Sequence, residues 1–400
     1  MNRRHTALIA VVALVVAACA GADDTTPNAQ PTRAETTTTT STTLPPTTTT
    51  TLPKLSIEGA PPALSEVIEQ FYLYATGSDD AVPLAPPTVV DSISPSGVEV
   101  PTSGSAAVAA FKEQAIAVVE MGEDVFLTVA DGGGWRIVGG VWPSLAVPAF
   151  FGGGPRHVAV VGSDARPGQN MERSRADSIH FVALDGAGGG AVVGLPRDSF
   201  VPVPGYGTRK ITGSLALGGP DTMMAAFTEL TDLPLEGYVL TGFAGFQELL
   251  GTVLGGVAVE IPFAINDRWA HVALSAGEQM LNGAQALGFA RARKTVPNGD
   301  FTRSAHQGLI LLAAASTVKE MGYSAIPGLM EAAEPHLSTN LTPEQLLTFS
   351  AMAISADLDS VSNVVAPGSP GSAGGSSVVF LANSADDLWA DLADGTLQGG

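Results

Sequence analysis

Residues 157–166 read HVAVVGSDAR, and this stretch decides the fold class. Its first part, Val158–Val161, is a short apolar run rich in β-branched residues and predicts a buried strand. Asp164 and Arg166 follow that strand directly. Side chains at strand ends in an α/β sheet converge on the crevice where ligands bind. The stretch therefore predicts a sheet with charged side chains gathered at its edge.

The chain beyond this strand alternates between strand-like and helical patterns. Apolar runs predict further strands at 179–184, 191–195 and 377–381. Helical periodicity occupies the segments 221–231, 243–254, 282–292, 302–320 and 384–393. Thr342 and Asn282 are expected N-caps, because a glutamine stands three residues after each. Residues 155–395 are thus expected to form an α/β domain with a mixed central sheet covered by helices.

Residues 55–150 predict a small α+β accessory domain. Two segments carry apolar residues at helical spacing, namely Leu64, Val67, Ile68, Phe71 and Ala75, and then Val108, Phe111, Ala115 and Val118. Val125–Val129 and Trp135–Val138 flank Asp131-Gly132-Gly133-Gly134 and predict a β-hairpin. The glycine-rich run at 150–155 predicts the boundary with the second domain. The sequence indicates no chemistry, and no particular partner, for this module.

The amino-terminal end has the pattern of an export signal. Arg3 and Arg4 precede a short apolar run, and Val16-Ala17-Ala18-Cys19 resembles a lipobox, whose cysteine is lipidated. We therefore expect a lipoprotein-type signal peptide at 1–19 and lipidation of Cys19, the single cysteine of the chain. Ordinary cleavage after Ala18 or Ala20, or an uncleaved anchor, remains open. The Thr/Pro-rich residues 20–54 predict a disordered tether. The expected location is extracytoplasmic, at the membrane of a bacterial cell.

The charges are distributed unevenly. The net charge is −20, yet twelve of the nineteen Lys and Arg residues lie between Arg156 and Arg303. An acidic protein is a poor nucleic-acid binder, because such binding rewards a basic surface. Guanidinium groups interleaved with carboxylates instead suit a multiply charged anion, such as a phosphate, together with a divalent cation. Arg156, Arg173, Arg209 and Arg268 are expected to be solvated loop charges.

The order of the charged motifs resembles the LytR-CpsA-Psr family of bacterial envelope proteins over residues 155–395. The resemblance is carried by Val161-Gly162-Ser163-Asp164-Ala165-Arg166, Arg175-Ala176-Asp177-Ser178, Leu195-Pro196-Arg197-Asp198-Ser199, Pro204-Gly205-Tyr206-Gly207, Lys210-Ile211, Leu254-Gly255-Gly256-Val257, Ala276–Leu287, Arg291-Ala292-Arg293 and Asp300-Phe301-Thr302-Arg303. It implies transfer of a glycopolymer from a polyprenyl-pyrophosphate carrier to peptidoglycan, with a phosphodiester link as product. Thr212 and Ser178 stand where the family often has Asn and Thr, which implies tuning of the site.

The resemblance also implies roles for individual residues. Asp164 and Asp177 would hold a Mg²⁺ ion. Pyrophosphate would be bound by Arg166, Arg175, Arg197, Lys210, Arg291, Arg293 and Arg303, with Gln307 on the same helix face as Arg303. Arg197, Asp198 and Asp300 would be the catalytic residues, the two aspartates orienting the arginines or helping to activate the acceptor hydroxyl. The lipid tail would lie in an apolar pocket beneath these charges.

Other interpretations stay open at this point. The same pocket would suit a non-catalytic polyprenyl-phosphate-binding regulator, or a pyrophosphatase acting on the same carrier. Asp300 and Arg303 could be a surface ion pair at a helix start. Leu309–Leu312, Phe243 and Phe246 could line a lipid tail or simply pack in the core. Ser163 lacks the second glycine of a nucleophile elbow. The transferred glycopolymer and the oligomeric state are not indicated.

Overall fold

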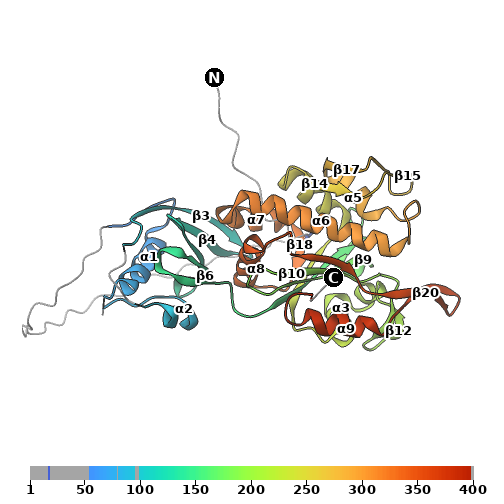
Figure 1. The fold of residues 1–400 in the computed structure, drawn as a ribbon, viewed down its shortest axis with the longest axis horizontal. Helices are drawn as coiled ribbons and strands as arrows, with labels where there is room; N and C mark the ends of the chain where they lie inside the picture. Colours follow the sequence, from blue (N-terminus) through green and yellow to red (C-terminus); the bar gives the residue numbers. More distant parts are fainter. Residues whose placement is uncertain (1–16, 19–53, 79, 95–98, 398–400) are drawn as a thin grey trace, which may run out of the picture.

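The computed structural model describes residues 17–18, 54–78, 80–94 and 99–397, and they form two sheets with their covering helices (Figure 1). The predicted lipidation site Cys19 and the predicted tether up to residue 53 lie outside the described residues, as does the predicted signal peptide apart from β1 (Ala17–Ala18). Within the described residues no single helix is long and apolar enough to cross a membrane, and one bent pair, Asp300–Met321 with Tyr323–Ala333, passes by length and composition alone.

The first sheet has six strands in the order β2-β3-β4-β5-β6-β7. These strands are β2 (Ser56–Glu58), β3 (Ser103–Phe111), β4 (Gln114–Met121), β5 (Asp124–Asp131), β6 (Gly134–Trp142) and β7 (Val147–Phe150). One face packs on α1 (Pro62–Ala75), where Phe71 stacks on Trp142 at 5.4 Å, and α2 (Pro87–Ser92) lies beside β7. The hairpin predicted around Gly132 and Gly133 is confirmed by the pairing of β5 with β6.

The helix expected around Val108–Val118 is wrong. This segment is the β3–β4 hairpin, and Lys112 (φ 49°) with Glu113 (φ 62°) forms its turn. The reason is that both faces of the sheet are buried. In β4, Ile116 and Val118 belong to one core, while Ala117 and Val119 belong to the other. Apolar residues therefore fill consecutive positions, and the period-2 signal of a strand is lost.

The second sheet is mixed and has the order β1-β18-β13-β8-β9-β10-β19. Its strands after β1 are β8 (Arg156–Ser163), β9 (Ala176–Leu184), β10 (Gly190–Gly194), β13 (Leu235–Thr241), β18 (His336–Thr339) and β19 (Ser362–Val365). β8 is antiparallel to β9 and parallel to β13, and β10 is parallel to β19. The α/β class with a mixed central sheet is confirmed, including the strand predicted from Val158–Val161.

Helices cover both faces of this sheet (Figure 1). On one face lie α3 (Gly213–Thr231) and α9 (Ser384–Leu392), whose Phe227 and Trp389 both contact Phe181 of β9. On the other face lie α4 (Phe243–Glu248), α5 (Gly283–Arg291), α6 (Asp300–Met321), α7 (Ile326–Ala333) and α8 (Pro343–Ser355). Capping boxes at Asn282 and Thr342 begin α5 and α8 as predicted.

Short hairpins lie around this domain. They are β11 (Phe200–Val203) with β12 (Gly207–Lys210), β14 (Val257–Ile261) with β17 (Gly277–Leu281), β15 (Ile265–Asp267) with β16 (Val272–Leu274), and β20 (Gly368–Ala373) with β21 (Ser376–Leu381). The β20–β21 hairpin is anchored next to the Pro-Arg-Asp motif, because the Val379 N–H donates to the Asp198 carbonyl at 2.9 Å.

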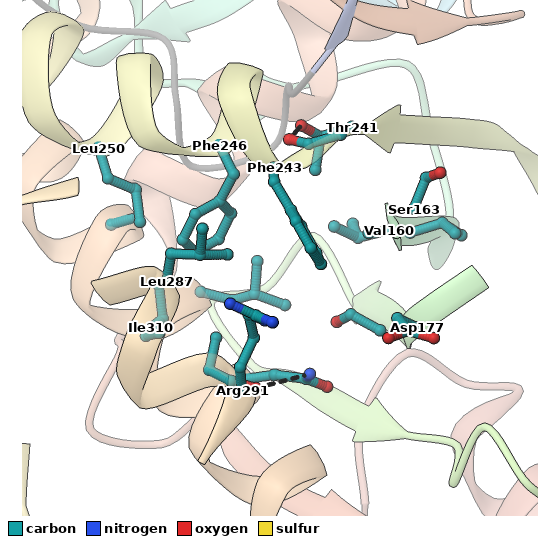
Figure 2. A pocket seen from close by; sticks show the side chains of 18 of the residues that line it. Val160, Ser163, Asp177, Thr241, Phe243, Phe246, Leu250, Leu287, Arg291 and Ile310 are labelled. Carbon is teal, nitrogen blue, oxygen red and sulfur yellow. Dashed lines mark hydrogen bonds between the residues drawn. The ribbon is translucent and has the colours of Figure 1, made fainter. Parts of the chain in front are cut away.

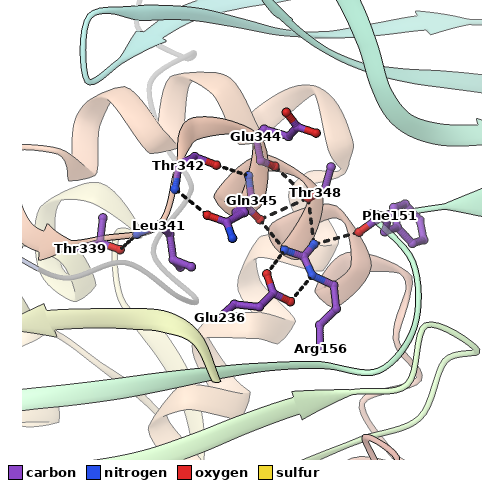
Figure 3. Close-up of polar contacts among 9 residues, drawn as sticks. All are labelled: Phe151, Arg156, Glu236, Thr339, Leu341, Thr342, Glu344, Gln345 and Thr348. Atoms are coloured by element: carbon purple, nitrogen blue, oxygen red, sulfur yellow. Dashed lines mark hydrogen bonds and ion pairs between the residues drawn. The ribbon is translucent and has the colours of Figure 1, made fainter. Parts of the chain in front are cut away.

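The two sheets are joined by α7 and α8. Ile116, Val118 and Leu127 of the first sheet share one core with Leu329 of α7 and Leu347 of α8. Arg156 fixes this junction (Figure 3): it donates to both carboxylate oxygens of Glu236 at 2.6 Å and to the Phe151 carbonyl at 2.8 Å. The expectation that Arg156 is a solvated loop charge is therefore wrong. Its side chain is buried, with carboxylate and carbonyl partners that replace water.

Candidate functional site

An apolar cavity of about 80 Å³ lies between the central sheet and helices α4, α5 and α6 (Figure 2). Phe246, Leu250, Leu287 and Ile310 lie toward one end, and Ser163 and Asp177 lie toward the other. Of the residues considered for a lipid tail, Phe243, Phe246, Ile310 and Leu311 line the cavity, whereas Leu309 and Leu312 do not. The cavity is thus apolar over most of its wall and charged at the end near Asp177, which we call its mouth.

A bulge in the sheet brings Asp177 to this mouth. The register of β8 and β9 shifts between Gly162, which faces Ser178, and Ser163, which faces Ala176, so Asp177 is the extra residue. A bulge re-aims one side chain out of the ladder. A Cβ atom at Gly162 would lie only 3.0 Å from the Ser178 Cβ, so glycine lets the two strands approach here. The motifs Gly-Ser-Asp and Arg-Ala-Asp-Ser therefore act as one structural unit.

Five ionic contacts connect the predicted cations and carboxylates near the mouth. Arg197 Nη1 lies 2.5 Å from Asp177 Oδ1, and Arg303 Nη2 lies 2.6 Å from Asp300 Oδ1. Lys210 Nζ lies 3.0 Å from Asp198 Oδ1. Arg293 bridges the two sides, at 3.6 Å from both Asp198 and Asp300. Residues spread over more than 120 positions of sequence thus form one charged cluster.

The cluster has unused hydrogen-bonding capacity. Among the described residues, the buried Nε atoms of Arg197 and Arg303 donate no hydrogen bond, and Asp300 Oδ2 has neither a hydrogen bond nor an ion-pair partner. Burial lowers the pKa of Arg303 to about 10 although Asp300 opposes this, so the group is still protonated at neutral pH. Burial also acts to lower the pKa of Arg197, but the nearby carboxylates, Asp177 foremost, outweigh it and raise that pKa. Buried donors without acceptors are costly, which indicates that an anion completes this site.

The backbone around the cluster aims its side chains. The Thr212 N–H donates to the Arg197 carbonyl at 3.0 Å, which fixes the Pro-Arg-Asp loop beside β12. Asn298 (φ 51°) and Gly299 (φ 53°) adopt left-handed conformations directly before α6. That turn places Asp300 in the first turn of the helix, with Arg303 one turn later on the same face. Asp300 and Arg303 are each 7% exposed, so they do not form a surface ion pair.

Arg291 and Gln307 lie on the cavity wall. The Arg291 guanidinium stacks over the Phe243 ring at 4.7 Å, which holds a cation against an otherwise apolar surface. Gln307 donates from Nε2 to the Ala290 carbonyl at 3.0 Å and thereby connects α6 to α5. Arg303 and Gln307 both line the cavity, as their four-residue spacing predicts.

Two of the predicted residues lie outside the cluster. Arg166 is exposed and borders a separate hollow formed by the segments 165–172, 242–245 and 335–338. Asp164 follows β8, but its Oδ1 accepts from the Arg175 N–H at 2.8 Å and its side chain does not line the cavity. Both residues follow the strand end as predicted, but the chain turns away after Ser163. A position directly after a strand end is therefore not enough to place a side chain at the site.

Two open hollows flank the cluster. The Arg175 hollow, lined by Arg175, Arg197, Arg209, Lys210, Arg293 and Ala373, has a volume of about 740 Å³. The Lys294 hollow, lined by Arg293, Lys294, Asn298, Asp300, Phe301 and Pro370, has a volume of about 510 Å³. Asp198, Arg293, Ser377 and Val378 line both.

Asp267 is a residue that the sequence did not single out. It is 1% exposed, and its carboxylate accepts backbone N–H groups of Trp269, Ala270, Arg293 and Lys294 at 2.9–3.1 Å. Burial acts to raise its pKa, but these backbone hydrogen bonds outweigh it and lower that pKa. Asp267 thus fixes the backbone that carries Arg293. An aspartate ending a short strand-like segment gives no local sign of partners 26 residues away.

Few carboxylates at the site are placed to bind a hard cation such as Mg²⁺. No group of three or more His, Cys, Asp or Glu side chains in the described residues could hold a metal ion. Asp177 lies at the cavity mouth, and its Oδ1 is already 2.5 Å from Arg197 Nη1. Mg²⁺ keeps several waters and takes one or two carboxylates, so this donor set is compatible with it.

A buried histidine near the site should make stability depend on pH. His306 stacks on Phe289 at 4.3 Å, its ring nitrogens have no hydrogen-bond partner among the described residues, and burial lowers its pKa to about 4. In the unfolded chain the His306 imidazole takes up a proton near pH 6.5, whereas in the folded protein it does so only near pH 4. The free energy of unfolding is therefore highest above pH 6.5 and falls as the pH drops toward 4. We expect His306→Phe to remove about 3 kcal/mol of the stability difference between pH 7 and pH 4.

Urea unfolding at both pH values measures this difference, with an Asn variant of the exposed His271 as the matched control. An unchanged difference in His306→Phe would mean that His306 does not stay neutral in the folded protein.

Comparisons with known proteins agree with this architecture. The LytR_cpsA_psr family model matches residues 151–394. A Bacillus cereus (strain AH820) protein named polyisoprenyl-teichoic acid–peptidoglycan teichoic acid transferase TagU is 29% identical over 197 residues, which is 48% of this chain and 62% of that protein. A Corynebacterium glutamicum protein named probable cell wall biosynthesis protein LcpB is 32% identical over 175 residues, which is 41% of this chain and 42% of that protein. The match thus spans less than two thirds of each relative.

Solved structures share the fold. The crystal structure of Bacillus subtilis TagV aligns with a TM-score of 0.52 and 24% identity, covering 61% of this chain and 98% of that one. A structure described as TagT bound to LI-WTA aligns with a TM-score of 0.51 and 23% identity, covering 61% of this chain and 91% of that one. At these identities the likeness shows the fold alone.

Proposed function

The chain belongs to the LytR_cpsA_psr family, and we propose that it transfers a glycopolymer from a polyprenyl-pyrophosphate carrier to peptidoglycan. The name of the TagU relative, a transferase between polyisoprenyl-teichoic acid and peptidoglycan, supports this class of reaction. We further propose that the protein works at the outer face of a bacterial membrane, anchored through lipidated Cys19.

One observation carries the proposal: arginines with buried, unused Nε–H donors lie at the mouth of an apolar cavity. Arg291 and Arg303 line the cavity itself, and Arg197 contacts Asp177 at its mouth. This arrangement suits an amphiphile with a multiply anionic head and an apolar tail. A polyprenyl pyrophosphate has both features. The cavity of about 80 Å³ is smaller than a long tail, so binding would require lining side chains such as Phe243, Phe246 and Leu287 to move apart.

The residues of the cluster would divide the work as follows. Arg197, Arg293 and Arg303 would neutralise the charge that develops on the pyrophosphate oxygens during transfer. Phosphoryl transfer depends mainly on such electrostatic stabilisation and on positioning. Asp177 and Asp300 hold Arg197 and Arg303 in place through contacts of 2.5 and 2.6 Å. Lys210 and Arg175, on the rim of the Arg175 hollow, would bind the phosphate nearer the glycan.

Asp177 would hold a Mg²⁺ ion, with Asp164 acting at most through a bound water. The Asp177 carboxylate lines the mouth, where Arg197 already contacts its Oδ1 at 2.5 Å, so Mg²⁺ would bind beside that guanidinium, whereas one Asp164 oxygen already accepts the Arg175 N–H. When bound, Mg²⁺ would neutralise charge on the pyrophosphate and fix its orientation.

The direct test is a transfer assay with purified protein. A polyprenyl-pyrophosphoryl glycan and peptidoglycan should yield glycan linked to peptidoglycan by a phosphodiester, together with polyprenyl phosphate. Release of the glycan phosphate into solution would instead favour a pyrophosphatase, and tight binding without any cleavage would favour a regulator. Either result would contradict the transferase proposal.

The proposed Mg²⁺ site predicts a loss of transfer activity when the metal is removed. Chelation with EDTA should reduce transfer by at least about tenfold, and added Mg²⁺ should restore it, because charge neutralisation is worth several kcal/mol in such reactions. Asp177→Asn should require a higher Mg²⁺ concentration for half-maximal rate, while Asp164→Asn should change that concentration less. The readout is the transfer rate against Mg²⁺ concentration. Full activity in EDTA would remove the metal from the mechanism.

A further inference from the structure

The two hollows beside the charged cluster are connected to the apolar cavity in the same way. Asp177 lines the cavity, and its partner Arg197, 2.5 Å away, lines the Arg175 hollow. Arg303 lines the cavity, and its partner Asp300, 2.6 Å away, lines the Lys294 hollow. Each hollow thus meets the cavity across one ion pair, and the Asp198–Arg293 pair lies between them.

The hollows differ in charge. The Arg175 hollow has five basic side chains, Arg175, Arg197, Arg209, Lys210 and Arg293, against the single carboxylate of Asp198. The Lys294 hollow has Arg293 and Lys294 balanced by Asp198 and Asp300. A basic hollow suits a ligand that carries phosphate, whereas a balanced one suits a ligand with many hydroxyl groups and little charge.

Asp300 gives the Lys294 hollow an acceptor for a hydroxyl group. The residue is 7% exposed; its Oδ1 contacts Arg303 at 2.6 Å, and within the described chain its Oδ2 has neither a hydrogen bond nor an ion-pair partner. Its contacts with Arg303 and Arg293 keep it in place as an anion. A carboxylate accepts hydrogen bonds and does not donate them, so the complementary ligand group is a donor such as a sugar hydroxyl.

We propose that the Lys294 hollow is the acceptor subsite, which binds the peptidoglycan sugar whose hydroxyl attacks, and that the Arg175 hollow binds the phosphate-proximal part of the donor glycan. This division rests on the proposed transferase function. In-line displacement places the attacking and leaving oxygens on opposite sides of phosphorus. With the leaving polyprenyl phosphate toward the cavity, the attacking hydroxyl would approach across one of the two ion pairs, and the balanced charge of the Lys294 hollow selects the Arg303–Asp300 side.

The step balances with these groups alone. The acceptor oxygen forms a bond to the sugar-proximal phosphorus, and the bond from that phosphorus to the bridging oxygen breaks. The bridging oxygen leaves with the electron pair as part of polyprenyl phosphate. The hydroxyl proton passes to the Asp300 carboxylate and from there to solvent.

Separate Michaelis constants for the two substrates test the assignment. Lys294 is exposed and its Nζ lies 4.4 Å from the Trp269 ring, so Lys294→Ala removes a side chain from the rim without disturbing the core. We expect Lys294→Ala to raise the KM for a soluble, uncrosslinked peptidoglycan strand about fivefold and to leave the donor KM unchanged. Phe301→Ala, in the same hollow, should act in the same direction. Arg209→Ala, in the other hollow, should raise the donor KM instead.

The outcomes distinguish failure of the subsite assignment from failure of the proposed transferase function. An acceptor KM unchanged in both Lys294→Ala and Phe301→Ala, or a rise in the donor KM alone, would overturn the assignment. If the wild type made no transfer product, the proposed function would fail, and direct binding of the same peptidoglycan strand would still test the hollow. Weaker binding by Lys294→Ala would then support the subsite, and equal binding would overturn it.

Discussion

Arg197→Ala is expected to lower kcat/KM for transfer by about 10²- to 10³-fold, the usual loss when a transition-state donor is removed. The wild-type guanidinium contacts Asp177 at 2.5 Å and lies at the cavity mouth with an unused Nε–H. The variant therefore loses a positive charge where negative charge develops. It also leaves Asp177 without its cation, so that a bare carboxylate repels the pyrophosphate.

Two controls distinguish catalysis from folding. Arg197→Lys keeps the charge but loses the planar pair of donors, so it should retain an intermediate rate. Arg136→Ala, on the first sheet, should transfer at the wild-type rate. Steady-state kinetics and urea unfolding on all three variants provide the measurement. Wild-type kcat/KM in Arg197→Ala would contradict the proposed role of the cluster.

Arg156→Ala is expected to lower the free energy of unfolding by about 3–5 kcal/mol, as is typical when one partner of a buried ion pair is removed. The Arg156 side chain donates to Glu236, Phe151, Gln345 and Thr348, and all four acceptors lose that hydrogen bond (Figure 3). Those partners belong to β13, to the end of the first sheet and to α8. The loss therefore weakens the junction between the two sheets.

Arg136 is the matched control for this prediction too. It also bridges the first sheet to α8, through Glu344 at 2.5 Å, but its side chain is 40% exposed. Exposed ion pairs contribute less than about 1 kcal/mol, so Arg136→Ala should change stability little. Urea unfolding compares the two variants directly. Equal losses would mean that burial does not set the strength of the Arg156 network.

The local sequence predicted an element correctly where a single local pattern determined it. Val158–Val161 predicted β8, and the residues Thr342 and Asn282 marked helix starts, because capping chemistry is read within four residues. The four-residue spacing of Arg303 and Gln307 placed both on the cavity wall. Arg197, Arg293 and Arg303 were expected together because charged motifs followed strand and helix ends, and the structure brings them into one cluster.

Local sequence failed where distant packing decided the outcome. The β3–β4 hairpin was taken for a helix because α1 covers one face of its sheet and α7 and α8 cover the other. Arg156 was expected in solvent because its partner Glu236 lies 80 positions away. Arg166 and Asp164 were expected in the cluster, but the loop after β8 turns them elsewhere. Each error concerns a tertiary contact that no short motif encodes.

A crystal structure of the protein with a bound polyprenyl pyrophosphate tests the central claim most directly. The account predicts both phosphate groups in contact with Arg197 and Arg303, with the first tail carbons between Phe243 and Leu287. A head group bound in another part of the molecule, such as the hollow beside Arg166, or a tail outside the cavity, would contradict it.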